Sequence, residues 1–358
     1  MKNKIEFFIQ SSDNFYEDKN LGDIDSKHKR IINLAYTEFV KENFNSNNFK
    51  NWTGQSDLTV PAQISLLQFK KNGFLKTIFK FFFRFLFRFS SDKFLKSTIL
   101  DDIEIIKQKT DGENLLLDNP VHKTPGSTLF FEYNKTTLNI RWLRYIYLLQ
   151  KIKSFKLIDK NQIWVDVGSY YGGLAGLVKK YFPHIKIILV DFHHQLCRSY
   201  IYLSELYPDA KHILPNSVEK FKNFSDLPNG CIMYVPVSQY KEITNNHVDL
   251  YTNFFSFGEM KSETFKSYTK SNLYKKAKNI YLVNRFVSSP YFENTYDTDL
   301  NILDYNLKKN DFSYFDIFPI HHYMLLKRKV LGRKQFRNFS SPYFEFIKLG
   351  KNKSLLMD

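Results

Sequence analysis

The segment from Trp164 to Gly176, WVDVGSYYGGLAG, constrains the fold of this 358-residue chain more than any other. A run of apolar residues ends there in an aspartate, a glycine-rich turn follows, and an apolar segment with helical spacing comes next. A buried strand, a glycine turn and a helix in direct succession indicate a unit of a parallel α/β sheet. Such a turn lets a ligand approach the N–H groups of the helix N-terminus, because glycine has no Cβ.

The same alternation continues to the end of the chain. Helices are predicted at 172–182, 193–207 and 263–278, between apolar strands at 162–168, 186–192, 231–237, 248–255 and 279–286, with a short extra strand at 211–214. We therefore expect an α/β, Rossmann-like fold whose mostly parallel sheet is covered on both faces. Residues 321–329 and 343–350 are predicted to form a C-terminal antiparallel hairpin at one edge of this sheet.

The chain before residue 156 does not show this alternation of strands and helices. Residues 1–60 form a polar segment in which one helix is expected, over Lys27–Phe44. Residues 61–155 are expected to be mainly helical, with a loop inside 111–128 and an amphipathic helix over 138–155. The α/β domain is expected over 156–350, and 351–358 form a tail.

Residues 73–94, GFLKTIFKFFFRFLFRFSSDKF, are predicted to form a cationic amphipathic helix. Its cations Lys76, Lys80, Arg84 and Arg88 recur at a spacing that places them in one stripe, and Phe and Leu cover the remaining surface. This pattern is typical of a helix that lies on an anionic membrane. A buried helix that turns its basic stripe to solvent is the alternative. The segment is too short and too charged to be expected to span a bilayer.

The net charge favours an anionic partner. There are 52 Lys and Arg residues against 36 Asp and Glu, a formal charge of +16, which suits nucleic acid, acidic lipid or a phosphorylated substrate. The basic residues are dispersed without a dense basic tail, which makes nucleic acid the less favoured partner. Cys197 and Cys231 provide neither a disulfide framework nor a thiolate zinc site. Since no signal-peptide pattern is found, we expect a cytoplasmic protein, peripheral on the inner membrane if 73–94 binds lipid.

Details of the glycine turn narrow the choice of ligand. A dinucleotide site usually has the pattern G-x-G-x-x-G, but Tyr170 stands here at the second glycine, where a pyrophosphate would approach. The lysine of a P-loop is also absent, so NAD and ATP are disfavoured and S-adenosylmethionine is favoured. Asp166, which ends the first strand, can face the ammonium group of that cofactor. Asp191, which ends the second, can accept hydrogen bonds from the ribose hydroxyls.

The residues expected to contact the cofactor lie in these two segments. A helix cap formed by Asp191 and a tight turn formed by the glycines are the purely structural alternatives. The predicted set comprises Asp166, Gly168, Ser169, Tyr170, Tyr171, Gly172, Gly173, Asp191 and Phe192.

The segment WVDVGSYYGGLAGLVKKYFP, followed by IILVDF, resembles the core of class I S-adenosylmethionine-dependent methyltransferases. More narrowly, the chain resembles the sugar O-methyltransferase family of bacterial glycan and antibiotic clusters, whose motif (V/L)-(D/E)-(I/V)-G-x-x-Y-G-G-L-A is matched by Val165–Ala175. Asn119–Pro120 match an upstream Asn-Pro of that family, residues 253–260 match its N-x-x-S-F-x-E-M element, and Asn284–Arg285 match its N-R pair. The resemblance covers about residues 115–350 and implies methyl transfer to a sugar hydroxyl.

Methyl transfer to a hydroxyl requires an aligned acceptor and a group that removes its proton. Ligands of this kind of sheet lie at the carboxyl ends of its strands, so residues 253–260, 284–285 and 321–322 are expected around the acceptor. The candidate catalytic residues are Glu259, His321 and His322, with His247 as a further candidate base. Sugar contacts are expected from Asn253, Ser256, Asn284 and Arg285.

The chemistry of the acceptor also follows from this segment. Asn253-Phe254-Phe255 lacks both prolines of the Asn-Pro-Pro-Tyr box of N-methyltransferases, which favours an oxygen acceptor. Carboxylates near Asp249 and Glu259 leave a metal conceivable, but none is expected. The leading hypothesis is therefore a sugar O-methyltransferase of surface polysaccharide or lipid-linked glycan assembly, with a lipid-linked or phosphorylated acceptor. The alternatives are an RNA methyltransferase and a non-catalytic, membrane-associated scaffold with a methyltransferase fold.

Overall fold

The computed structural model describes residues 4, 7, 8, 10, 11, 99–121, 130–221, 223–260, 262–287, 300–307, 313–320, 328–330, 333–335 and 342–350. The predicted helices at Lys27–Phe44 and 73–94 lie outside these residues, as do His321 and His322. The chain forms two compact units. The first, called the sheet unit below, comprises 1–42, 151–318 and 336–358, and the second comprises 43–150 and 319–335. The domain boundaries expected from the sequence stay a prediction.

The sheet unit is built on an eight-stranded sheet with the strand order β5-β6-β4-β3-β7-β8-β12-β9. Neighbouring strands from β5 to β8 are parallel, and β12 runs antiparallel to both β8 and β9. In this order the strands are His212–Ile213, Ile232–Pro236, Lys186–Asp191, Ile163–Val167, Leu250–Phe254, Asn279–Arg285, Tyr343–Lys348 and Tyr314–Ile317. Every residue of β3, β4, β6 and β7 is buried, as their continuous apolar runs predict.

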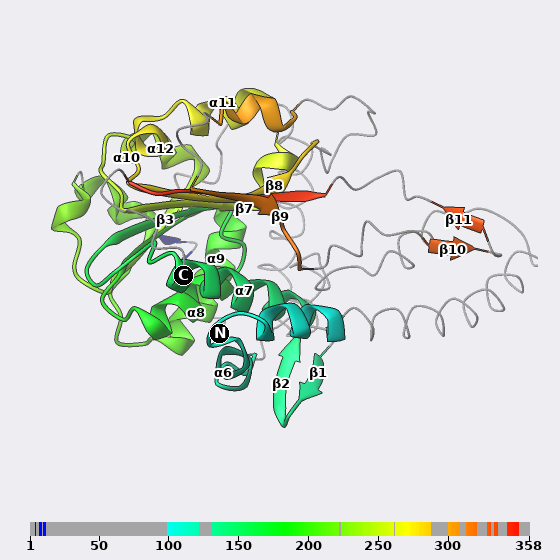
Figure 1. Cartoon of the computed structure of the whole chain (residues 1–358). Helices are drawn as coiled ribbons and strands as arrows, with labels where there is room; N and C mark the ends of the chain where they lie inside the picture. Colours follow the sequence, from blue (N-terminus) through cyan, green and yellow to red (C-terminus); the bar gives the residue numbers. More distant parts are fainter. Residues whose placement is uncertain are drawn as a thin grey trace, which may run out of the picture. The chain divides into compact units, whose positions relative to one another are not determined.

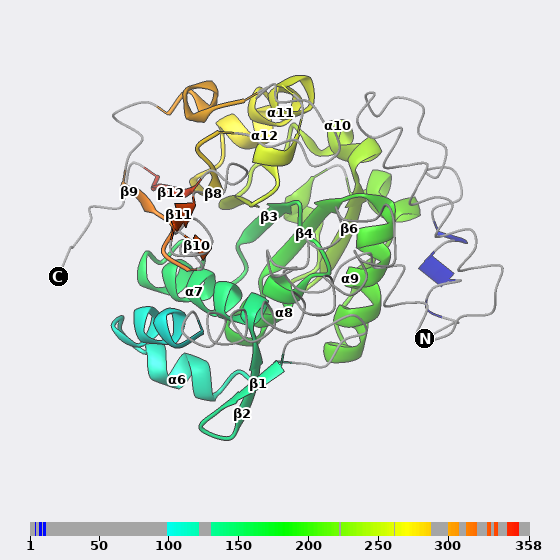
Figure 2. The ribbon, with the colours of Figure 1, turned by 90° about the vertical axis from the view of Figure 1, so that its right-hand side faces the viewer.

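Helices cover both faces of this sheet (Figure 1). On one face lie α8 (Gly173–Tyr181) and α9 (His193–Leu206), which lie side by side along β4 and β6 when the molecule is turned (Figure 2). On the other lie α10 (Tyr240–Ile243), α11 (Ser262–Thr269) and α12 (Asn272–Lys275). Short 3₁₀ turns occur at Pro215–Lys220, Phe224–Asp226, Val237–Gln239, Phe257–Glu259 and Ile302–Tyr305.

The predicted single helix over 263–278 is wrong, because it is divided into α11 and α12. Ser271 begins the second helix, and its side chain accepts a hydrogen bond from the Tyr274 N–H. A serine at this position satisfies one of the unpaired donors of the new helix start. The inner sides of both helices supply aromatic residues to the core above the sheet, which contains Phe257, Phe265, Tyr268, Leu273, Tyr274, Phe344 and Phe346.

The antiparallel C-terminal strands are confirmed, but their pairing differs from the predicted hairpin. Residues 343–348 form β12 inside the sheet, between β8 and β9, and β9 is Tyr314–Ile317 rather than the segment that begins at residue 321. Arg328–Val330 (β10) pairs instead with Arg333–Gln335 (β11) in a separate two-stranded sheet of the second unit. The core residues Phe344 and Phe346 of β12, both at most 1% exposed, explain why this strand lies inside the sheet.

The second unit contains a helix at 99–107, α6 (Gly112–Leu117), the hairpin of β1 (Phe130–Tyr133) and β2 (Thr136–Asn139), and most of α7 (Ile140–Ser154). The indole N–H of Trp142 donates to the carbonyl of Asn119 over 2.7 Å, and the Asn119 amide donates to the Leu115 carbonyl. Asn119, which is 2% exposed, therefore joins α6 to α7. Among the described helices, none combines the length and apolarity that crossing a bilayer requires.

Candidate active site

The turn between β3 and α8 lies at the carboxyl edge of the sheet. The Gly168 N–H donates to the Val190 carbonyl over 2.8 Å, which ties the turn to the end of β4. Gly168 and Gly172 have φ angles of 80° and 77°, in the left-handed region that glycine adopts without strain. A Cβ at Gly168 would also collide with the Ser256 hydroxyl. Two requirements, backbone conformation and close packing, therefore call for glycine at this position.

Asp191 is held at the end of β4 by two backbone donors. One carboxylate oxygen accepts the Tyr170 N–H and the other accepts the Phe192 N–H, each over 2.7 Å. Each oxygen keeps a lone pair for a further donor such as a ribose hydroxyl. Burial raises the pKa of Asp191 to about 7. Phe192, and not Asp191, is the N-cap residue of α9, so the helix-cap alternative for Asp191 does not apply.

Asp166 is buried at the end of β3 and is bonded to a neighbouring strand. Its carboxylate accepts the Thr252 hydroxyl over 2.7 Å, and that hydroxyl accepts the Trp164 indole N–H over 2.8 Å. Burial, with the nearby charge of Asp191 as a smaller cause, raises the pKa of Asp166 to about 7. Neither Thr252 nor Trp164 is among the site residues expected from the sequence. The period of two along β3 could have placed Trp164 beside Asp166, but the partner in β7 depends on strand register.

The hydroxyl of Ser169 lies in the turn between these carboxylates and has no hydrogen-bond partner among the described residues. Ser169 is only 6% exposed. Buried hydroxyls are normally paired, so the Ser169 hydroxyl is available for a hydrogen bond with a polar ligand at the turn. The donors and acceptors at this edge thus fit a cofactor that has hydroxyl, ammonium and carboxylate groups.

Tyr170, at the position of the second glycine, has a φ of 54° and packs against α9. The guanidinium of Arg198 lies 4.5 Å from the centroid of the Tyr170 ring. The centroids of the Tyr170 and Tyr171 rings are 5.2 Å apart. The Ser199 hydroxyl donates to the Tyr170 carbonyl over 2.8 Å. Arg198 is 6% exposed and was also missed by the sequence analysis, since nothing in its local sequence distinguishes it.

Asn253, at the end of β7, is 0% exposed, and its side chain bonds to three groups of the protein. Its amide donates to the Val167 carbonyl over 2.8 Å and to the Ser256 hydroxyl over 2.6 Å, and its oxygen accepts the Phe257 N–H over 3.0 Å. Asn253 and Ser256 thus join the end of β3 to the loop after β7. Direct contact of either residue with a substrate stays a prediction.

Asn284, in β8, is likewise 0% exposed. Its amide donates to the Asn253 carbonyl over 3.2 Å, and its oxygen accepts the Gly258 N–H over 3.4 Å. The predicted acceptor residues Asn253 and Asn284 therefore do come together, but as part of the framework that holds the loop. A contact between Asn284 and a sugar stays a prediction too.

Glu259 and Arg285 are the more accessible members of the predicted acceptor site. A carboxylate oxygen of Glu259 lies 3.6 Å from an Arg285 nitrogen, with side chains 36% and 15% exposed. The Arg285 guanidinium also lies 5.5 Å from the Tyr343 ring centroid. Next to them, Phe255 has a left-handed φ of 66° and contacts the rings of Phe318 and Tyr343. This edge therefore combines a carboxylate, a guanidinium and aromatic rings.

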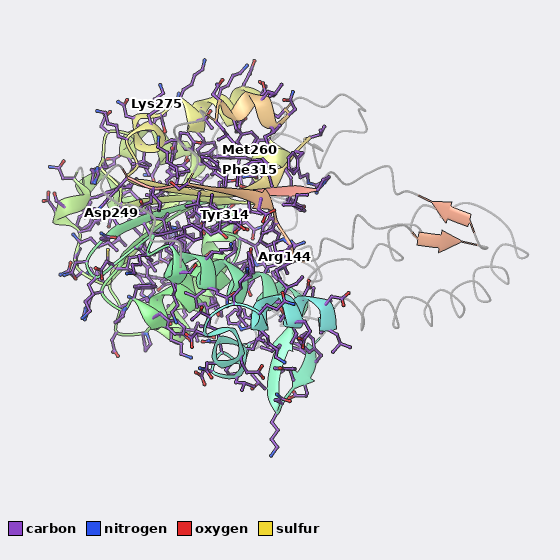
Figure 3. The ribbon with its side chains drawn as sticks, viewed as in Figure 1. Arg144, Asp249, Met260, Lys275, Tyr314 and Phe315 are labelled. Carbon is purple, nitrogen blue, oxygen red and sulfur yellow. The ribbon has the colours of Figure 1, made fainter. Side chains whose placement is uncertain are left out.

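Two residues near β7 do not belong to this edge. His247 and Asp249 precede β7 at its amino end, opposite the loop of Glu259, as the labelled Asp249 and Met260 show (Figure 3). His247 as a candidate base is therefore wrong, since the length of the strand separates it from the glycine turn. Asp249 accepts the Ile163 N–H over 3.0 Å and cannot share a ligand with Glu259. Among the described residues, no group of three or more His, Cys, Asp or Glu side chains could hold a metal.

Phe192 and the two histidines after it begin the helix that follows Asp191. Burial lowers the pKa of His193 to about 3, so its imidazole is neutral. The His193 ring lies 5.1 Å from the Phe8 ring, which itself is 0% exposed. The N-terminal segment thus packs against the start of α9, next to the predicted ribose site.

Comparisons with known proteins identify no family for this chain. No family model matches the chain, and no curated protein matches it. Solved structures that are similar include the small RNA methyltransferase HEN1, with 13% identity and a TM-score of 0.37 over 66% of this chain and 27% of that one. The methyltransferase domain of bacterial CtHen1-CN has 15% identity and a TM-score of 0.34 over 59% of this chain and 100% of that one.

A third is phosphoethanolamine N-methyltransferase 2 of Haemonchus contortus, with 13% identity, a TM-score of 0.27 and coverage of 43% of this chain and 30% of that one. In two of these three comparisons, this chain spans less than a third of the solved chain. The scores are low, so the fold is stated from the strand order itself. The order β6-β4-β3-β7-β8-β12-β9, with β12 reversed and β5 added at one edge, is a mostly parallel, Rossmann-like α/β sheet with antiparallel C-terminal strands. The predicted fold class is confirmed.

Proposed function

We propose that this protein binds S-adenosylmethionine and transfers its methyl group to a hydroxyl of a sugar. One observation carries the cofactor part. The buried carboxylates of Asp166 and Asp191 end adjacent parallel strands on either side of a left-handed glycine turn, which contains the unpaired Ser169 hydroxyl. This arrangement suits a nucleoside with an amino-acid end.

Each group of the turn has a role in this proposal. Asp191 accepts hydrogen bonds from the ribose hydroxyls, while its own position is held by the Tyr170 and Phe192 N–H groups. Asp166, oriented by Thr252, faces the ammonium group, and the N–H groups at the start of α8 face the carboxylate. Tyr171 and Gly173 border the methionine end. When bound, the cofactor supplies an electrophilic methyl group on a sulfonium.

The acceptor part rests on the sequence resemblance together with the chemistry of the loop after β7. Glu259 is the described residue that can take a proton from an acceptor hydroxyl, and Arg285 orients it from 3.6 Å. His321 and His322 stay candidate bases. The acidic and basic groups beside the Phe255 ring suit a polyhydroxylated ring. The proposal also includes a lipid-linked or phosphorylated acceptor. It further includes membrane association through residues 73–94, which liposome flotation tests.

Calorimetric titration with S-adenosylmethionine tests the cofactor part. Micromolar binding is expected, and Asp191→Ala should weaken it more than about 100-fold, because bonds to a charged acceptor are lost in a buried site. Asp209→Ala, an exposed aspartate of the same unit, is the matched control and should bind as the unmodified protein does. Absence of binding by the folded protein would refute the proposal.

Transfer of a labelled methyl group tests the acceptor part. The label is expected in nucleotide sugars or in a glycan extract, and its alkali stability should match an ether. Label in RNA, with none in the glycan fraction, would show that the sugar assignment is wrong while leaving the cofactor assignment in place. Salt-sensitive RNA binding would accompany that result.

A further inference from the structure

Tyr170 is the unusual residue of the glycine turn. It replaces the glycine whose lack of a side chain normally lets a ligand approach the backbone. A tyrosine at a φ of 54° is also uncommon, because a bulky side chain disfavours the left-handed region. Such a residue persists only when its surroundings determine its conformation, and strained residues of this kind gather at functional sites.

Contacts with its backbone and with its ring fix Tyr170. Its N–H donates to Asp191, its carbonyl accepts the Ser199 hydroxyl, and its ring lies under the guanidinium of Arg198. The two backbone contacts hold the peptide, while the guanidinium of Arg198 and the Tyr171 ring, 5.2 Å away, both contact the Tyr170 ring. Arg198 also lies 6.0 Å from the Tyr171 ring, and its Nη1 donates to the Gln195 side chain over 3.0 Å, so its own position is determined.

We propose that Arg198 is a positioning residue which keeps the Tyr170 ring stacked against α9 and thereby leaves the turn from Gly168 to Gly173 open to the cofactor. The inference rests on the proposed function, since it concerns the same site. A planar guanidinium on a buried helix face holds an aromatic ring by a cation–π contact, and that contact is stronger where water is excluded. Without the guanidinium, the ring loses its cation–π contact with α9 and is held less firmly away from the turn.

The inference separates two roles that a buried arginine could have here. If Arg198 acts through the ring, replacing Arg198 lowers the cofactor affinity only while Tyr170 is present. If Arg198 contacts the cofactor itself, or acts through the charge that it places near Asp191, its loss matters whether or not the ring is there. A double-mutant cycle distinguishes these cases, because it measures whether the two effects depend on each other.

The experiment is calorimetric titration with S-adenosylhomocysteine, a ligand that binds without reacting. The variants are Arg198→Met, which keeps much of the side-chain volume, Tyr170→Gly, and the two combined. Arg198→Met should weaken binding on the order of tenfold. The affinity of Tyr170→Gly is the reference for the double variant, and adding Arg198→Met to it should change that affinity by less than about threefold.

Lys153→Met is the matched control, because Lys153 lies 4.7 Å from the Tyr181 ring in the same unit and away from the turn. It removes a cation from an aromatic ring and should leave the affinity unchanged. If Arg198→Met does not fold, Arg198→Lys completes the same cycle, since it keeps the charge but loses the planar stack. Thermal unfolding of each variant reports folding separately from binding.

Three results would overturn the inference. The first is an unchanged affinity for Arg198→Met, and the second is an equal loss of affinity with and without the tyrosine. In both, the unmodified protein still binds, so the proposed function stands while the positioning role fails. The third is no binding by the folded, unmodified protein, which refutes the proposed function and the positioning role together.

Discussion

The two halves of the candidate active site are built in opposite ways. At the ends of β3 and β4, two buried carboxylates have pKa values raised to about 7, and a buried hydroxyl has no partner among the described residues. At the ends of β7 and β8, the buried amides of Asn253 and Asn284 bond to the backbone around them. The first half keeps a buried hydroxyl to which no described residue bonds, whereas the buried amides of the second half bond within the protein. The second half has one such atom too, Nε of Arg285, which has no partner among the described residues.

This difference shows where a ligand would contribute binding energy. Buried carboxylates without a buried cation in hydrogen-bond contact are costly, and a ligand that donates to them removes part of that cost. The amides of Asn253 and Asn284 already bond to groups of the protein, so their main contribution is to the shape of the loop. In the second half the accessible chemistry lies instead on Glu259 and Arg285.

The largest expected effect on folding is that of Asn253→Ala, which tests whether the second half is structural. The change leaves the Phe257 N–H and the Val167 carbonyl without a side-chain partner in a buried region. Each unsatisfied group costs about 1–3 kcal/mol, so the free energy of unfolding should fall by about 2–5 kcal/mol. Urea unfolding measures this fall.

Asn245→Ala provides the control for that experiment. Asn245 is exposed and accepts a bond from Asn272 over 3.2 Å, so its loss should cost less than about 1 kcal/mol. Should Asn253→Ala prove as stable as this control, the contrast between the two halves would be lost. Asn253 would then be a candidate for direct substrate contact.

The next effect is a pH dependence that only the first half should show. Ribose hydroxyls bond best to an ionised Asp191, whose pKa in the unliganded protein is raised to about 7. Affinity for S-adenosylhomocysteine should therefore fall as the pH drops below about 7, by up to about tenfold per pH unit. His193, with its pKa lowered to about 3, stays neutral over this range.

Unliganded stability should depend on pH in the opposite direction. Because burial raises the folded pKa of Asp166 and Asp191 above the usual 3.8, each group favours folding at low pH, and this contribution is lost as the pH rises through about 7. Asp191→Asn should bind S-adenosylhomocysteine more weakly than the unmodified protein, and its affinity should vary less with pH. An unchanged profile in this variant would assign the titration to another group.

The smallest expected effect belongs to Glu259→Gln. Its ion pair with Arg285 is partly exposed, so the free energy of unfolding should change by less than about 1 kcal/mol. Cofactor affinity should not change. Glu263→Gln, an exposed acid on α11, is the matched control. A large loss of stability in Glu259→Gln alone would place Glu259 with the structural amides rather than with the accessible groups.

Much of the fold follows from local pattern, and the exceptions have physical reasons. The strands from β3 to β8 were predictable because continuous apolar runs indicate strands buried on both faces. The break between α11 and α12 has a local signal in Ser271, which caps the second helix. The pairing of β12 with β9 has no such signal, because strands joined by long connections choose partners through tertiary packing.

The candidate site divides in the same way. Asp166, Asp191 and the glycines could be predicted, since their chemistry depends on their place at strand ends and in a turn. The structural use of Asn253 could not, because its partner Val167 lies 86 residues away. The same holds for Arg198, whose stacking partner comes from the turn before α8 and not from its own helix.

The sequence by itself determined the alternation of strands and helices, the position of the glycine turn and the two aspartates at neighbouring strand ends. Each of these depends on residue type and local spacing. Only the tertiary structure decided which polar groups would be buried, which would find partners and how Tyr170 would be held. Burial, strand register and cation–π contacts join segments far apart in the chain, so they exist only after those segments have packed together.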